Sequence, residues 1–229
     1  MNILTISDLH GRDTWKQENL HNYDLIIFLG DYCDSLEYKS YHIFDNLQNI
    51  INLKEKYGNK IILLWGNHDI QYLFAGKYQC SGYREEDMLQ LNNLFKLNKQ
   101  KFQLAFQYNN YIWSHAGIHK GWWNLWIKDK GKIKHGENIA DTLNRLFNEQ
   151  YEPIFHCGIW RGGKHKVGGP LWLDRNEMGV KPIEGYHQIV GHTPTKKRRI
   201  VTITNFKNKN TSITYTDNEN FENYKLDIE

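Results

Sequence analysis

The sequence predicts an α/β fold in which buried strands alternate with helices. Short apolar runs rich in Ile, Leu and aromatic residues recur along the chain, and each run is continuous rather than alternating, as in strands that are buried on both faces. Between these runs, apolar residues recur at helical spacing. The length of 229 residues is enough for one large domain with a sizeable core.

Five of the predicted strands lead directly into a polar motif. The strands are residues 3–6, 25–29, 61–65, 111–113 and 189–190, and the motifs are Ser-Asp-Leu-His-Gly at 7–11, Gly-Asp-Tyr-Cys-Asp at 30–34, Gly-Asn-His-Asp at 66–69, Ser-His-Ala-Gly at 114–117 and Gly-His-Thr at 191–193. Open α/β sheets bind their ligands at the carboxyl ends of neighbouring strands. We therefore expect the polar side chains of these motifs to gather at strand ends.

Three helices are predicted from the spacing of apolar residues. The first includes residues 43–51, and Gly58 offers it a C-terminal stop. The second includes residues 88–95 and follows three acidic residues at 85–87, which favour the positive end of a helix dipole. The third is predicted over residues 138–149.

The remaining segments predict a loop and a second sheet. Residues 155–176 are rich in glycine and irregular, which is typical of a loop that lines a site. Residues 200–204 and 212–215 alternate like strands of a second sheet. No stretch reaches the roughly 18 apolar residues of a membrane span, and the N-terminus does not have the pattern of a signal peptide. We therefore expect a cytoplasmic protein without a membrane partner.

The motifs supply an oxygen and nitrogen ligand set large enough for two divalent metal ions. Carboxylate oxygens and imidazole nitrogens suit Mn, Fe or Zn. Two metal ions close together are the usual device for hydrolysing a phosphate ester, since one activates water and both hold the transferring oxygens. The candidate ligands are Asp8, His10, Asp31, Asn67, His115 and His192.

In their order and spacing, the five motifs resemble the calcineurin-like metallophosphoesterase superfamily, and more narrowly its phosphoprotein phosphatase branch of bacterial and phage type. The resemblance covers residues 1–195 and implies one domain over residues 1–229, folded as a four-layer α/β/β/α sandwich. It also implies that Asp8 and His10 bind the first metal, that Asp31 bridges both metals, and that the other three ligands bind the second. Manganese is the expected metal, with iron, zinc or nickel as alternatives.

The last motif indicates which branch of the superfamily this chain resembles. Many phosphodiesterases of the superfamily end in Gly-His-x-His, whose second His adds a ligand to the first metal. Here the motif reads Gly191-His192-Thr193-Pro194, and a proline cannot ligate. This arrangement resembles that of the phosphoprotein phosphatases, and it also occurs in the related symmetrical diadenosine tetraphosphatases.

The resemblance implies a general acid and its partner. His68 corresponds to the acid that protonates the leaving oxygen, and Asp34 corresponds to the carboxylate that orients it. A neighbouring carboxylate favours the imidazolium form, which a proton donor needs near neutral pH.

The chain departs from the family at the position of a phosphate-binding arginine. Phosphoprotein phosphatases continue the second motif with Arg-Gly, whereas this chain has Ser35 and Leu36. A hydroxyl cannot replace a bidentate guanidinium, so another arginine is expected to bind the phosphate. The candidates, in order of preference, are Arg161, Arg84 and Arg175, with Arg12 behind them.

These features predict a metal-dependent phosphomonoesterase similar to serine/threonine protein phosphatases, which by resemblance uses attack by a metal-bridging hydroxide. The alternative is a dinucleoside polyphosphate hydrolase or a nucleic-acid phosphoesterase. The net charge of +3 is too mild to argue for nucleic acid, but the basic run Lys196-Lys197-Arg198-Arg199 keeps a phosphorylated or nucleic-acid partner open. A non-catalytic scaffold is a third hypothesis, which the retention of His68 and all six ligands disfavours.

Overall fold

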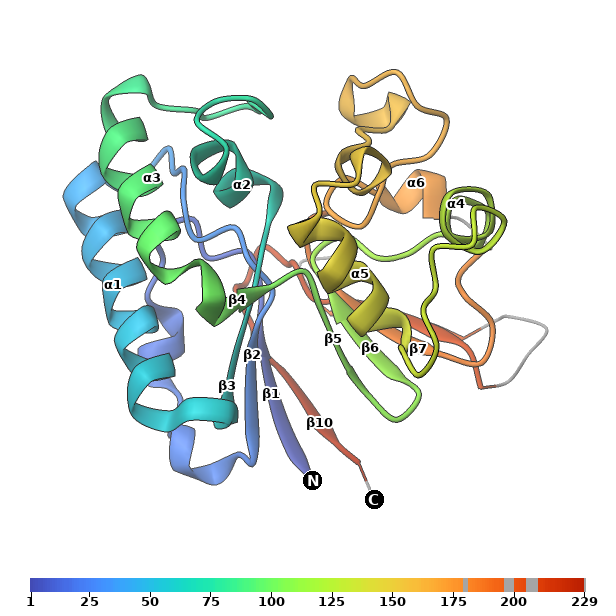
Figure 1. Cartoon of the computed structure of the whole chain (residues 1–229). Coiled ribbons are helices and arrows are strands. Elements are labelled where there is room, and N and C mark those ends of the chain that lie inside the picture. Colours follow the sequence, from blue (N-terminus) through green and yellow to red (C-terminus); the bar gives the residue numbers. More distant parts are fainter. Residues whose placement is uncertain (179–180, 196–199, 205–209, 229) are drawn as a thin grey trace. The chain divides into compact units, whose positions relative to one another are not determined.

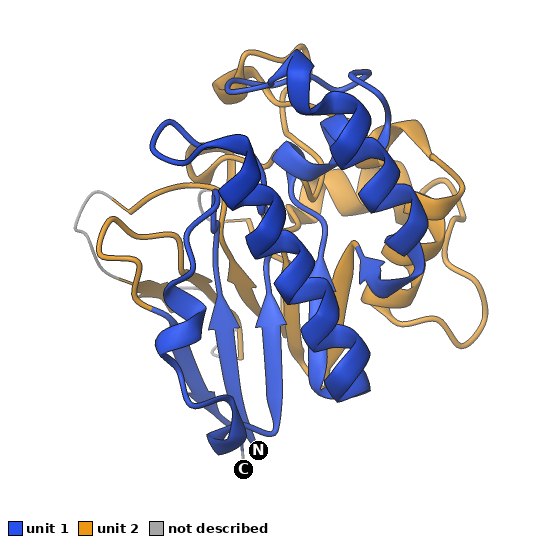
Figure 2. Ribbon diagram, turned by 90° about the vertical axis from the view of Figure 1, so that its left-hand side faces the viewer, with its two compact units in different colours: residues 1–103, 223–229 blue, residues 104–222 orange. Residues whose placement is uncertain are grey.

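The structure, a computed structural model, describes residues 1–178, 181–195, 200–204 and 210–228. The chain divides into two compact units, which Figure 2 shows in different colours. Unit 1 comprises Met1–Gln103 and Asn223–Glu229, and unit 2 comprises Leu104–Glu222. Each unit contains one five-stranded sheet with helices, so the predicted α/β class with two sheets is confirmed. The basic run at 196–199 lies outside the described residues.

The sheet of unit 1 brings three of the five motifs together. Its strand order is β10-β1-β2-β3-β4, with β1 to β4 parallel and β10 antiparallel to β1. Because β1, β2 and β3 are parallel neighbours, their C-terminal ends, and the motifs that follow, lie at the same edge. The strands are β1 (Asn2–Ile6), β2 (Leu25–Phe28), β3 (Ile61–Leu64), β4 (Phe102–Gln103) and β10 (Tyr224–Asp227).

Two long helices of unit 1 lie side by side on one face of this sheet (Figure 1). Helix α1 (Ser40–Tyr57) ends where Gly58 adopts a φ of 54°, as its sequence predicts. Helix α3 (Glu85–Asn98) begins with the acidic turn, and the shorter α2 (Asn67–Leu73) packs against it. Short 3₁₀ helices complete the unit at Thr14–Gln17, Leu20–Asn22, Gly58–Lys60 and Lys99–Lys101.

The sheet of unit 2 carries the other two motifs. Its order is β5-β6-β7-β9-β8, in which β6, β7 and β9 are parallel and the two outer strands are antiparallel to their neighbours. The ends of the parallel neighbours β6 and β7 lead into the motifs at 114–117 and 191–193. The strands are β5 (Ala105–Tyr108), β6 (Tyr111–Ser114), β7 (His187–Val190), β8 (Val201–Ile203) and β9 (Ser212–Tyr215).

The helices of unit 2 are shorter. Helix α5 (Ile139–Asn148) packs on β5 and is capped by Asn138, which confirms the third predicted helix. The predicted loop at 155–176 is largely irregular, with short helical turns within it. The other elements are α4 (Lys120–Trp123), a π-helical turn (Asn124–Lys128), 3₁₀ helices (Glu152–Phe155 and Ile159–Arg161) and α6 (Arg175–Met178).

The sequence did not predict β10. Its residues alternate between partly buried and exposed, so it lacks the continuous apolar run of β2 and β3. It is an edge strand whose pairing with β1 returns the end of the chain to unit 1. Within the described residues, no helix combines the length and the apolar character that crossing a bilayer requires.

Candidate metal centre and catalytic residues

Unit 1 presents four of the predicted metal ligands at the ends of its parallel strands. Asp8 and His10 follow β1, Asp31 follows β2, and Asn67 is the first residue of α2. The side chains of the two aspartates and of Asn67 are buried, whereas His10 is partly exposed. Buried carboxylates need charged or hydrogen-bonded partners, which is what a metal ion provides.

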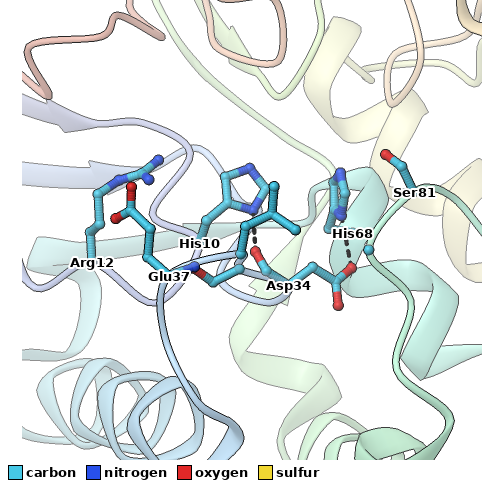
Figure 3. A pocket seen from close by; sticks show the side chains of 9 residues that line it. His10, Arg12, Asp34, Glu37, His68 and Ser81 are labelled. Carbon is cyan, nitrogen blue, oxygen red and sulfur yellow. Dashed lines mark hydrogen bonds and ion pairs between the residues drawn. The ribbon is translucent and has the colours of Figure 1, made fainter.

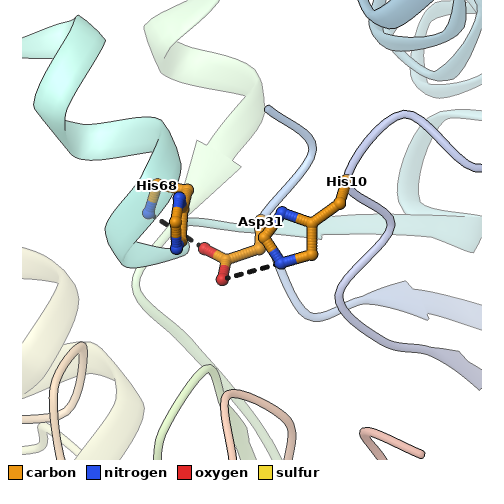
Figure 4. Close-up of side chains that lie close together, drawn as sticks. All are labelled: His10, Asp31 and His68. Carbon is orange, nitrogen blue, oxygen red and sulfur yellow. Dashed lines mark hydrogen bonds and ion pairs between the residues drawn. The ribbon is translucent and has the colours of Figure 1, made fainter. Parts of the chain in front are cut away.

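His10 is oriented so that one ring nitrogen faces Asp31 (Figure 4). Its Nδ1 donates to the backbone carbonyls of Cys33 and Asp34, both at 2.8 Å. Because carbonyls only accept, Nδ1 carries the hydrogen, which in a neutral ring leaves the lone pair on Nε2. Nε2 lies 3.7 Å from Oδ2 of Asp31. Metals bind such atoms at about 2.0–2.2 Å, so this pair fits a shared divalent ion.

A buried carboxylate that the sequence analysis gave no role organises the Asp31 loop. Asp69 is fully buried, and its Oδ2 accepts from the backbone N–H groups of Asp31 (2.8 Å) and Gly66 (2.9 Å). Its Oδ1 accepts from the backbone N–H groups of Tyr32 (2.9 Å) and Cys33 (3.4 Å). Asp69 therefore joins the motif after β2 to the motif after β3. The sequence offered only its place in Gly-Asn-His-Asp as a signal.

Replacing Asp69 by Asn is expected to lower the free energy of unfolding by about 3 kcal/mol, because an amide retains one accepting oxygen and leaves buried N–H groups unpaired. Urea denaturation measures this loss, and the midpoint should fall. Asp45→Asn is a matched control, since Asp45 is exposed on α1 and accepts from Asn49. Equal midpoints for the two variants would contradict the organising role of Asp69.

Two glycines allow the strand ends to approach closely. A Cβ at Gly66 would collide with Oδ1 and the backbone nitrogen of Asp31. A Cβ at Gly30 would collide with the backbone of Gly66, and the φ of Gly30 is +97°. The glycine that begins each of these two motifs is therefore required by contact between the two loops.

His68 is held by two carboxylates at the start of α2. Its backbone N–H donates to Oδ1 of Asp31 at 3.0 Å, and its Nδ1 lies 2.8 Å from Oδ2 of Asp34. Burial alone would lower the pKa of His68, but the charge of Asp31 and the hydrogen bond with Asp34 raise the pKa well above its usual value. The protonated, imidazolium form of His68 is thereby favoured.

Asp34 is fixed in turn by two side chains that sequence reasoning missed. The hydroxyl of Tyr72 donates to Oδ1, and the amide of Gln71 donates to Oδ2. Both residues lie on α2, one turn after His68. The His68–Asp34 pair is therefore supported from the same helix that carries His68.

The backbone is strained at many predicted site residues. Nine of the described non-glycine residues have positive φ, and five of these nine are predicted ligands or catalytic residues. Such conformations cost on the order of 1–3 kcal/mol each and cluster at functional sites. The five are Asp8 (34°), His10 (46°), Asp31 (53°), Asp34 (59°) and His192 (66°).

A pocket of about 360 Å³ in unit 1 opens over His10 and His68 (Figure 3). Its lining combines cationic, anionic, hydroxyl and apolar groups. Leu36, which follows Ser35, is fully exposed at this pocket. The other lining residues are Arg12, Asp34, Ser35, Glu37, Ser81 and Gly82.

Unit 2 brings the remaining two predicted ligands together. His115 and His192 follow the parallel neighbours β6 and β7, and both are buried. Nε2 of His115 lies 3.1 Å from Nδ1 of His192. The backbone N–H of Gly191 donates to the carbonyl of His115 at 2.8 Å, which links the two loops. Two imidazole nitrogens at this separation can share a proton or a cation.

The predicted substrate-binding arginines are anchored in different ways. Arg161 pairs with Asp174 (2.8 Å) and donates through Nη2 to the His192 carbonyl (3.1 Å) and the Thr193 hydroxyl (2.8 Å). Arg175 stacks over the ring of Tyr215, with its guanidinium carbon 5.1 Å from the ring centroid. In unit 1, the guanidinium of Arg84 is bound to the segment that follows Asp34. It donates to the Ser35 and Tyr38 carbonyls and the Ser40 hydroxyl, and lies 3.8 Å from Asp87.

Comparison with known proteins gives a family and a fold. A family model described as calcineurin-like phosphoesterase matches residues 1–217. A cold-active protein-tyrosine phosphatase of the psychrophile Shewanella sp. superposes with a TM-score of 0.64 at 17% identity, over 99% of this chain and 75% of that chain. A further structure of a cold-active protein tyrosine phosphatase gives 0.63 at 18% identity, over 99% and 73%. At sequence identities this low, the structural similarity shows that the fold is shared and nothing more. The curated proteins gave no match.

Proposed function

Because this chain belongs to the calcineurin-like phosphoesterase family, whose model matches residues 1–217, we propose that it is a metal-dependent phosphomonoesterase. The observation that carries the proposal is the geometry around Asp31 in unit 1. The lone pair of His10 Nε2 faces this buried carboxylate, and the His68–Asp34 pair is bound to the same loop. The first arrangement suits a metal ion and the second suits a proton donor.

The proposed metal ligands are six side chains from the motifs that follow the strands. We propose that they bind about two divalent ions per chain, and manganese is the expected metal. One family model matches residues of both units, which supports the proposed single domain over residues 1–229. The buried His115–His192 pair of unit 2 supplies imidazole nitrogens, a donor type that divalent transition-metal ions bind. The six are Asp8, His10, Asp31, Asn67, His115 and His192.

In this proposal the ions, when bound, would activate water and polarise the phosphate oxygens. The protein supplies the proton. His68 protonates the leaving oxygen, Asp34 holds its ring through Nδ1, and Tyr72 and Gln71 hold Asp34. A positioned acid of this kind contributes roughly 10²–10⁴-fold in rate.

The test is a substrate panel measured side by side with added Mn²⁺. The panel contains p-nitrophenyl phosphate, phosphoserine and phosphotyrosine peptides, diadenosine tetraphosphate and bis-p-nitrophenyl phosphate. Phosphotyrosine is included because two structures of similar fold are named as tyrosine phosphatases. We expect the monoesters to be hydrolysed fastest. Preference for the tetraphosphate or the diester would replace the proposal with the nucleotide-directed alternative, and no turnover would favour a scaffold.

Arg161→Ala is expected to lower kcat/KM by about 10- to 150-fold, the equivalent of about 1.5–3 kcal/mol for a charged hydrogen bond to phosphate. Among the described residues, its Nη1 has no hydrogen-bond partner, so it can donate to a substrate. Arg161→Lys should recover little, since an ammonium cannot make a paired contact. Lys164→Ala, an exposed cation of the same loop, is the control. Full activity in Arg161→Lys would contradict the assignment.

A further inference from the structure

The pocket over His10 and His68 contains a guanidinium in addition to these imidazoles. If the proposed function holds, the substrate phosphate must reach His10 and the acid His68, and both line this pocket. Unit 1 contains only two arginines, Arg12 and Arg84. Only Arg12 is among the lining residues (Figure 3). The guanidinium of Arg84 is instead committed to the carbonyls of residues 35 and 38.

Arg12 is held in place from both its backbone and its side chain. Its backbone N–H donates to the carbonyl of Leu9 at 2.8 Å, and its own carbonyl accepts from Nδ2 of Asn46 at 2.8 Å. Asn46 is buried on α1, and its Oδ1 accepts from the ring of Trp15 at 3.0 Å. Nη2 of Arg12 donates to the carbonyl of Asp8 at 3.0 Å. The guanidinium is therefore tethered beside two proposed metal ligands, which reduces the entropy lost when it binds an anion.

We infer that Arg12 binds the substrate phosphate in this pocket, as a specificity residue for the proposed phosphomonoesterase reaction. A guanidinium carries five N–H donors in a planar fork, so it can hold the Asp8 carbonyl and a phosphate oxygen at the same time. Lysine cannot reproduce this geometry, because its ammonium is a point charge without a fixed fork. The inference rests on the proposed function, since it takes the phosphate to lie over His10 and His68.

The same pocket contains a charge of opposite sign. Glu37 is exposed, lines the pocket, and its side chain lies toward that of Arg12 in Figure 3. A carboxylate near a bound phosphate dianion opposes its binding. Removal of the two charges should therefore have opposite effects on phosphate affinity, with Arg12 favouring the anion and Glu37 disfavouring it.

The experiment measures the inhibition constant of inorganic phosphate and the metal content of the Mn-loaded protein. Arg12→Met keeps the apolar stem and should weaken phosphate inhibition by about 10- to 150-fold, with normal metal content. Arg12→Lys should recover little of this loss, and Glu37→Gln should strengthen inhibition several-fold. Lys16→Met, which removes an exposed cation in the next turn of chain, is the control. Isothermal titration with phosphate gives the same comparison without turnover.

Three results separate the inference from its premise. Unchanged phosphate affinity in Arg12→Met, with wild-type metal content, would overturn the inference and leave the proposed function intact. Loss of metal in Arg12→Met would also overturn it, because Arg12 would then act by holding the Asp8 loop. A wild-type protein that neither binds metal nor turns over any phosphomonoester would refute the proposed function itself.

Discussion

Asp31→Asn is expected to lower the metal content from about two ions per chain to below one, and to lower turnover by about 10³-fold or more, since the ions supply several kcal/mol of transition-state stabilisation. Asparagine matches aspartate in size but lacks the negative charge of the carboxylate that is proposed to bridge the two metal ions. The backbone N–H of residue 31 still donates to Asp69, so the loop has reason to keep its shape.

Elemental analysis and turnover of p-nitrophenyl phosphate measure these two losses. Asp45→Asn is again the control, because it removes an exposed carboxylate of the same unit. Normal metal content in Asp31→Asn would reject the bridging role. Loss of a single ion, with the other retained at full occupancy, would assign Asp31 to one metal only.

His68→Ala is expected to keep its metal and its fold but to lose roughly 10²–10⁴-fold in turnover of phenyl phosphate. The loss should shrink for p-nitrophenyl phosphate, whose leaving group needs little protonation. The physical basis is the pairing of His68 with Asp34 and the charge of Asp31, which favour the imidazolium form.

The test of acid catalysis by His68 is the loss of turnover on phenyl phosphate divided by the loss on p-nitrophenyl phosphate. His21→Ala, which removes an exposed histidine of unit 1, should leave both rates unchanged. Equal losses on the two substrates would show that His68 positions the substrate rather than protonating the leaving oxygen.

The sequence predicted those elements that carry a continuous apolar run or a strong helical period. All of β2 and β3 is buried, so their runs are unbroken, and α1 ends at Gly58 as its sequence indicates. Strand β10 was missed because its half-exposed residues depend on pairing with β1, about 220 residues earlier in the chain. Such non-local pairing leaves little local signal.

The residues of the candidate site also fall into those that the local sequence indicated and those that it did not. Residue type and motif order indicated Asp31 and His68, because ligation and acid catalysis require those side chains. The role of Asp69 depends on four backbone N–H groups from two loops, and Gly30 and Gly66 are required by the close approach of the same two loops. Neither property is written in the local pattern, because both arise only when the loops meet.

Sequence position alone could not decide which arginine binds the substrate phosphate. Position alone placed Arg84 ahead of Arg12, but side-chain contacts decide which guanidinium lines the pocket over His10 and His68. Arg84 holds the segment after Asp34, and Arg12 lines the pocket over His10. The predicted contact of Arg161 with phosphate stays a prediction, with its anchoring beside His192 as support.

The central claim is that phosphomonoester hydrolysis by this chain depends on two metal ions. Titration of chelator-stripped protein with Mn²⁺, followed by turnover of p-nitrophenyl phosphate, tests it most directly. We expect negligible turnover without metal and a rise that saturates at about two ions per chain. Turnover that survives complete metal removal, or that saturates at one ion per chain, would contradict it.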